Sequence, residues 1–229
     1  MQTPAATKTL KSLGCLSKHI SSSLLRQGMG TFQMKSRSEI STFSSQSSEK
    51  RVAIFIDGNN FYFGLRKLYG KNKSLKHFDF KGFSQFLAEK DKVVDIFYYN
   101  ALLDKEHNPS EYESQKEFFE KLKEISHLHL ILCKLLKRNI TGTDKFYYII
   151  KEDDIHMAVD MVENAYEDNF DIAVLVSGDG DFVPAVNSVK KKGKIVKNIY
   201  FKNSSSRNLK NFCNQSLELT KEILDKFLN

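Results

Sequence analysis

The features that are scarce in this sequence narrow the kinds of protein it can be. The 229-residue chain has only three cysteines, Cys15, Cys133 and Cys213, and no C-x-x-C pair. This argues against a disulfide framework and against a zinc knuckle. No apolar run approaches the roughly 20 residues of a membrane-spanning helix, which argues against an integral membrane protein. No G-x-G-x-x-G motif follows the first expected strand, so a dinucleotide site is not indicated either.

Acidic residues are almost missing from the N-terminal segment, residues 1–48. It contains twelve serines and six basic residues against one acidic residue, Glu39. On a helical wheel, one arc holds the apolar residues Leu10, Leu13, Leu16, Ile20 and Leu24, and the opposite arc holds Lys8, Lys11, Lys18 and Arg26. A basic, acid-poor and Ser-rich amphipathic helix at the N-terminus is typical of an organelle transit peptide. We therefore expect residues 1–48 to direct import into the mitochondrial matrix, with a plastid or the cytoplasm as the alternatives. A disordered basic arm and a helix lying on a membrane surface are the other interpretations.

The positive charge of the chain lies mostly in this segment. Residues 1–48 carry +5 of the formal net charge of +7, which leaves +2 for the expected folded part, residues 49–229. The sequence pI of 9.1 is therefore poor support for nucleic-acid binding by the folded part.

Strand and helix patterns alternate through residues 49–229. The expected strands are 51–57, 94–101, 128–134, 171–177 and 194–201, and the expected helices are 60–70, 81–90, 111–125, 154–168, 182–193 and 217–227. Several of the strands are nearly continuous apolar runs, as expected for strands covered on both faces. The alternation predicts an α/β fold with a mainly parallel sheet. The segment 135–150, with T-G-T-D at its centre, interrupts this rhythm and predicts a hairpin or excursion at the sheet edge.

Carboxylates follow two of the expected strands directly. Asp57 ends the first strand, and Asp179 and Asp181 lie in the sequence SGDGDF after the fourth. Functional groups gather at the carboxyl ends of parallel strands, so these three side chains meet if the two strands are neighbours. The helix DIHMAVDMVENAY adds Asp160, which lies among apolar residues, and begins with Asp153 and Asp154. Asp153 is most simply an N-cap, whereas Asp154 can cap the helix and also face the site.

Carboxylates without cysteine favour Mg²⁺ or Mn²⁺ over zinc or copper. Such an ion activates water for phosphodiester hydrolysis. Gly58, Gly178 and Gly180 are expected to let the backbone approach a ligand closely. The alternatives are a plain turn, a calcium loop, which lacks the Glu at its twelfth position, and a phosphatase, which calls for a D-x-D-x-T sequence where this chain has IDGNNF.

Three motifs together resemble the NYN domain family, in particular its LabA-like branch, which is related to PIN-domain nucleases. They are IDGNNF at 56–61, the pair Asp154 and Asp160, and SGDGDF at 177–182, and the resemblance spans residues 51–201. It implies a three-layer α/β/α PIN-like fold and metal-dependent ribonuclease activity. By position, Asp57, Asp160, Asp179 and Asp181 match the acidic metal cluster of the family, and Asp154 matches its acidic position at the helix start. Asn60 and Ser177 match polar positions expected to orient the site or to contact a phosphate.

The candidate RNA contacts are basic residues that follow the expected elements. Lys134 follows the third strand, Lys190 lies near the end of the SGDGDF helix, and Arg66 and Lys67 close the first helix. Each can bind phosphate without regard to sequence, although Lys190 equally suits a helix C-terminus.

The hypothesis for function is a Mg²⁺- or Mn²⁺-dependent endoribonuclease that hydrolyses single-stranded RNA. The alternatives are a catalytically silent RNA-binding or assembly subunit, and a phosphatase for small phosphoesters. A homodimer and a subunit of a larger assembly are both compatible with the sequence.

Overall fold

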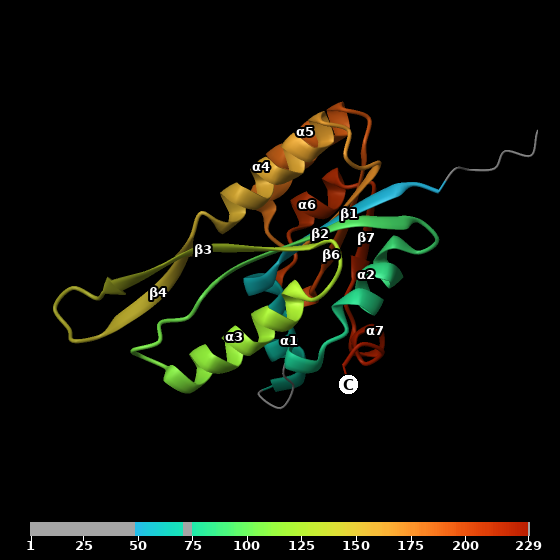
Figure 1. Cartoon of the computed structure of the whole chain (residues 1–229). Helices are drawn as coiled ribbons and strands as arrows, with labels where there is room; N and C mark the ends of the chain where they lie inside the picture. Colours follow the sequence, from blue (N-terminus) through green and yellow to red (C-terminus); the bar gives the residue numbers. More distant parts are fainter. Residues whose placement is uncertain (1–48, 71–74, 229) are drawn as a thin grey trace, which may run out of the picture. The chain divides into compact units, whose positions relative to one another are not determined.

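A seven-stranded sheet forms the centre of the fold, with strand order β4-β3-β2-β1-β5-β6-β7 (Figure 1). The computed structural model describes residues 49–70 and 75–228, which lie within one compact unit, Ser47–Asn229. The strands are β1 (Arg51–Asp57), β2 (Lys92–Ala101), β3 (Leu128–Asn139), β4 (Phe146–Lys151), β5 (Ile172–Val176), β6 (Ile195–Tyr200) and β7 (Gln215–Glu218). Every pairing is parallel except the antiparallel pairing of β3 with β4. The predicted mainly parallel sheet is confirmed.

Helices cover both faces of the sheet. One face carries α1 (Gly58–Tyr69), α2 (Phe80–Ala88), α3 (Pro109–Lys123) and α7 (Lys221–Leu224), and the other carries α4 (Asp153–Tyr166), α5 (Val183–Lys191) and α6 (Arg207–Phe212) (Figure 1). Burial on both faces explains why the sequence of strand β1 is continuously apolar. Val52, Ile54 and Ile56 belong to the core cluster under α1 to α3, while Ala53 and Phe55 belong to the cluster under α4 to α6. Successive side chains of a strand point to opposite faces, so burial on both faces requires an apolar residue at every position. The expected three-layer α/β/α fold is confirmed.

At the two edges of the sheet, one sequence-based prediction is confirmed and another is wrong. The hairpin expected within 135–150 is confirmed as the β3–β4 pair, which extends beyond the other strands (Figure 1). The helix expected over 217–227 is wrong. The chain instead forms strand β7, which pairs with the free edge of β6, and then the short helix α7. The burial of β7 shows no clear two-residue alternation, since Leu217 is exposed and Leu219, which follows the strand, is buried; the pairing with β6 is what makes this segment a strand. Helix α6 was also not expected.

The N-terminal expectations concern residues that the structure does not describe. The transit peptide or basic arm, residues 1–48, and with it the mitochondrial location, therefore stay predictions. Across the described ranges, none of the helices combines the length and the apolar character that a bilayer-spanning helix needs.

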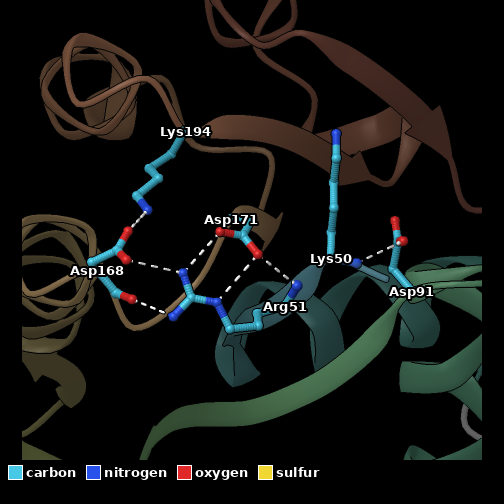
Figure 2. A network of polar contacts seen from close by, with 6 residues as sticks. All are labelled: Lys50, Arg51, Asp91, Asp168, Asp171 and Lys194. Atoms are coloured by element: carbon cyan, nitrogen blue, oxygen red, sulfur yellow. Dashed lines mark hydrogen bonds and ion pairs between the residues drawn. The ribbon is translucent and has the colours of Figure 1, made fainter. Parts of the chain in front are cut away.

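Polar side chains hold the starts of three strands together at the amino end of the sheet (Figure 2). Arg51, the first residue of β1, donates through Nη2 to Asp171 Oδ1 at 2.8 Å and through Nη2 to Asp168 Oδ2 at 3.2 Å. The Arg51 backbone N–H donates to Asp171 Oδ2 at 2.8 Å. Asp168 also accepts from Lys194, which lies just before β6. The Arg51 guanidinium lowers the pKa of the Asp171 carboxyl to about 2. We call these four residues the amino-end network.

Replacing Arg51 by Gln is expected to lower the melting temperature by several degrees, because two carboxylates lose their shared partner. The matched control is Lys50→Gln, since Lys50 bonds Asp91 through its backbone N–H, which the substitution leaves in place. The Asp171 pKa is depressed, so its stabilising contribution is present above about pH 4 and is lost as the pH falls toward about pH 2. Thermal unfolding across this pH range should therefore show the difference between wild type and Arg51→Gln shrinking in acid. A constant difference would contradict this account.

Candidate active site

The pairing of β1 with β5 places the first functional side chain. The register aligns Ile56 with Val176, so Asp57 and Ser177 leave the sheet side by side at its carboxyl edge. Ser177 Oγ donates to Asp57 Oδ2 at 3.0 Å, and the Asn60 backbone N–H donates to Asp57 Oδ1 at 2.9 Å. Because β2 lies on one side of β1 and β5 on the other, the strand order reverses here. Ligand sites of open α/β sheets lie at such a reversal.

Asp57 is a buried carboxylate with an unfavourable charge. Its residue is only 9% exposed, and burial raises its pKa to about 6. The hydrogen bonds from Asn60 and Ser177 lower the pKa, but the charges of Asp153 and Asp179 raise it further. A shift of about two units corresponds to roughly 3 kcal/mol against the ionised form. A carboxylate held at this cost is a common feature of functional sites.

The start of α4 brings two more carboxylates to the same place. Burial raises the pKa of Asp154 to about 7, and the charges of Asp153, Asp57, Asp179 and Asp181 raise it as well. The expectation that Asp153 or Asp154 caps the helix is wrong, because the N-cap is Glu152. Glu152 has a left-handed backbone, with φ of 76°, and its side chain makes no capping bond. Both aspartates thus lie inside the first turn, where the positive end of the helix dipole favours anions.

These carboxylates line a pocket of about 210 Å³. Its walls are Asp57, Asn59, Asn60, Phe63, Gly64, Lys67, Asp153, Asp154, Asp179 and Ser204. In the described part of the chain, no three His, Cys, Asp or Glu side chains are already arranged to hold a metal ion. The donor set nevertheless fits Mg²⁺ or Mn²⁺, because such ions are bound by one or two carboxylates together with water and substrate phosphate. The raised pKa values of Asp57 and Asp154 fit as well, because a cation would offset the repulsion that raises them.

Two of the four expected ligands, Asp160 and Asp181, are not among the residues that line the pocket. Asp160 is absent from the residues that line the pocket, and its Oδ2 accepts from Tyr99 Oη at 2.8 Å. Asp160 follows Asp154 by six residues, which turns it about 120° around the helix, away from the Asp154 face. Asp181 is exposed and outside the pocket lining, although its backbone N–H donates to Asp179 Oδ1 at 2.9 Å. Asp57, Asp154 and Asp179 therefore meet in the pocket, joined by Asp153.

The expected substrate contacts also separate into different places. Asn60 lines the pocket, whereas Ser177 is 1% exposed and lies against Asp57, so it positions that carboxylate. Lys134 pairs with Glu152 at 3.0 Å, next to the start of α4. Lys190 lies in the last turn of α5 and donates to the carbonyl of Phe212, the last residue of α6. Helix α5 begins beside the site and is about 13 Å long. The structure thus places Lys190 away from the pocket, while Lys67 of α1 lines it.

Ser204, which belongs to none of the sequence motifs, completes the pocket. Ser204 Oγ donates to Asn60 Oδ1 at 3.2 Å, and the Ser206 N–H donates to the Gly178 carbonyl at 2.9 Å. A Cβ at Gly178 would lie 1.7 Å from the Ser204 carbonyl oxygen. Gly178 therefore lacks a side chain because the protein's own backbone passes there, which corrects the expectation that it makes room for a ligand. The run SSSR at 204–207, in the segment that follows the carboxyl end of β6, was the available signal.

Comparisons with known proteins agree with this architecture. The sequence profile described as NYN domain matches residues 51–220. The "Low amplitude and bright protein LabA" of Synechococcus elongatus is 26% identical over 172 residues, which are 74% of this chain and 83% of that protein. Among solved structures, a protein of unknown function from Vibrio parahaemolyticus is similar with a TM-score of 0.57 and 20% identity, over 79% of this chain and 97% of that chain. At that identity the structural likeness shows the fold alone.

Gly178→Ala is expected to destabilise the protein by at least about 1–3 kcal/mol, because the added methyl must displace backbone. Gly180→Ala is the matched control, since a Cβ there meets the rotatable Ser206 Oγ at 2.8 Å. Chemical denaturation should show the larger loss for Gly178→Ala. Equal losses would mean that the close contact of residues 178 and 204 is not rigid.

Asp154→Asn is expected to stabilise the metal-free protein at about pH 8 and to change little at about pH 4. The folded pKa is raised, so the folded state keeps a proton that the unfolded chain releases, and this group costs stability as the pH rises from about 4 to about 7. Melting temperatures in EDTA measure the effect. Asp144→Asn, on the exposed β3–β4 connection, controls for the loss of one negative charge. An Asp154→Asn effect that is the same at both pH values would contradict the stated cause.

Proposed function

The chain belongs to the NYN domain family, and on that premise we propose that it is a metal-dependent endoribonuclease that hydrolyses phosphodiester bonds of single-stranded RNA. The family lies within the PIN-like nuclease superfamily, whose members generally use divalent metals and whose NYN domains generally bind RNA. The observation that carries the proposal is the meeting of buried Asp57 with Asp153, Asp154 and Asp179 around one pocket, at the reversal of strand order.

Asp57, Asp154 and Asp179 are the residues that would hold the ion. Bound Mg²⁺ or Mn²⁺ supplies a polarised water molecule and neutralises charge on the phosphate. The bond from Ser177 and the bond from the Asn60 N–H engage one oxygen of Asp57 each, so they fix the orientation of that carboxylate. Asp179 is fixed in turn, because its Oδ1 accepts from the Asp181 N–H.

Polar and basic groups at the wall supply contacts for a phosphate. Lys67 brings a positive charge to an otherwise acidic pocket, and Asn60 and Ser204 add hydrogen-bonding side chains. These groups can orient the phosphodiester, since contacts to phosphate position a nucleic acid without reading its sequence.

The size of the pocket favours a polymer over a small phosphoester. Its volume of about 210 Å³ is below the roughly 300–1,000 Å³ of typical small-molecule sites. A phosphate and its ion suit this space, while the rest of the substrate lies outside on the surface. This supports a nuclease over a phosphatase.

A catalytically silent RNA-binding subunit is the second candidate. It is favoured by the bond from Tyr99 Oη to Asp160 and by the lack, among residues 49–70 and 75–228, of a preformed three-residue metal site. This alternative predicts RNA binding without cleavage, and retention of RNA by Asp57→Asn.

The test is cleavage of end-labelled single-stranded RNA by the purified full-length protein with Mn²⁺. Wild type should produce fragments with 5′-phosphates, and EDTA should abolish the reaction. Asp57→Asn should reduce the rate at least about 100-fold, because metal-ion catalysis supplies several kcal/mol of transition-state stabilisation. Asp144→Asn, which lies outside the pocket, is the charge-matched control and should retain full activity.

Two results would overturn the proposal. Cleavage that persists in EDTA would exclude the metal-dependent mechanism, and RNA bound without any cleavage would favour the silent subunit.

A further inference from the structure

We propose that the outer face of α1 is a stacking subsite for one unpaired base of the bound strand, with Phe63 holding the base and Lys67 the adjoining phosphate. The inference rests on the proposed function for the identity of the strand. It goes beyond that function in naming the residues that select unpaired nucleotides and the chemistry by which they do so.

Two aromatic rings are exposed on α1 although the helix has a complete buried face. Phe61, Gly64 and Leu65 are buried, whereas Tyr62 is 38% and Phe63 55% exposed. An exposed ring beside a functional pocket contributes little to the core and offers a flat apolar surface to a partner. Single aromatic side chains on a protein surface are common, so the position of Phe63 relative to the pocket decides the argument.

Phe63 and Lys67 lie on the same side of α1 and both line the acidic pocket. Residues four apart on a helix are neighbours on its surface, so the ring and the ammonium group are adjacent. Of the described residues that line the pocket, Lys67 alone is basic. The wall formed by α1 thus offers an aromatic surface and a cation next to the carboxylates, which is the pairing used by proteins that bind single-stranded nucleic acids.

The surroundings of Phe63 make it a firm platform. Tyr62 is held by Arg66, whose Nη1 donates to Tyr62 Oη at 2.9 Å. The Tyr62 ring in turn meets the Phe63 ring edge-on, with centroids 5.4 Å apart and planes at 70°. Beneath them, a Cβ at Gly64 would lie 2.2 Å from the Phe201 ring, so α1 packs directly on the residue that follows β6. Phe63 is therefore supported by a neighbouring ring and a helix in close contact with the core.

This geometry implies a substrate class. A base in a duplex has both faces covered by its neighbours, so only an unstacked base can lie on Phe63. Every base has a π-face, so stacking tolerates any sequence. We therefore expect selection for unpaired over paired RNA, with little preference among bases.

The closing experiment measures binding of a short fluorescent single-stranded RNA to the full-length protein by anisotropy. Ca²⁺ is the divalent ion, chosen because it takes carboxylate oxygens as ligands. Phe63→Ala should raise Kd about 5- to 150-fold, the range for loss of one base–aromatic stack. Phe63→Leu should weaken binding similarly, because it keeps apolar bulk but not the ring, and Phe63→Tyr should bind like wild type. Lys67→Gln should lower the slope of log Kd against log salt concentration by about 0.7, the value for the loss of one phosphate contact to a single strand.

The control is Tyr166→Ala on α4, because Tyr166 is also 55% exposed and does not line the pocket. It should leave Kd unchanged. All variants should melt like wild type, since Phe63, Lys67 and Tyr166 are all exposed. RNA with an abasic site at the stacked position should bind wild type as weakly as Phe63→Ala and should show no further loss with that variant. Fully paired RNA should bind wild type and Phe63→Ala alike.

Cleavage measured on the same variants separates this inference from the proposed function. If wild type cleaves and Phe63→Ala has unchanged Kd and KM, the subsite is refuted and the nuclease stands. If Phe63→Ala weakens binding but wild type never cleaves, the nuclease is refuted and the subsite stands. Failure of wild type to bind single-stranded RNA would overturn the subsite.

Discussion

The parallel pairing of β1 with β5 is the constraint on which the site depends. In the chain these strands are separated by the strands β2, β3 and β4 and by the helices α1, α2, α3 and α4, yet they are neighbours in the sheet. Their register brings Asp57 and Ser177 together at one edge, where the hydroxyl donates to the buried carboxylate. At the amino ends of the same two strands, Arg51 and Asp171 form the corresponding polar pair, which is part of the amino-end network. Each strand is thus apolar between two polar ends, and a slip of one residue would break both pairs and turn every buried side chain to the wrong face.

The same constraint explains why the pocket is electrostatically unfavourable without a cation. The reversal of strand order opens a crevice between the α1 and α4 starts, and both segments deliver carboxylates into it. Burial and mutual repulsion raise the pKa values of Asp57 and Asp154, and the structure tolerates this because hydrogen bonds from Ser177 and Asn60 hold Asp57 in place. The loop after β6 then closes the pocket through Ser204 and prevents any side chain at position 178. Destabilisation of this kind is typical of sites arranged for a ligand.

The periodicity of the sequence was sufficient to predict the core of the fold. It was not sufficient where contacts between distant segments determine the position of a residue. The apolar run of β1 and the alternation of strands with helices predicted the layered fold, and the D-G and D-x-D motifs after strands predicted the position of Asp57 and Asp179. Asp160 was grouped with them because its apolar neighbours suggested burial, but its rotation around α4 directs it to Tyr99. Asp153 was interpreted as a cap because Asp is favoured at the N-cap, whereas the helix begins one residue earlier than expected, at Asp153, and its N-cap is Glu152. Ser204 and β7 depend on pairings between distant segments, which local patterns do not encode.

The account therefore depends on whether a divalent ion binds among Asp57, Asp154 and Asp179. Crystals soaked in Mn²⁺ and measured for anomalous scattering test this most directly. The account predicts an anomalous peak within the pocket, bounded by oxygens of at least two of these carboxylates, and no peak there in Asp57→Asn crystals. Full Mn²⁺ occupancy elsewhere with an empty pocket, or a peak centred on Asp160 and Tyr99, would contradict it.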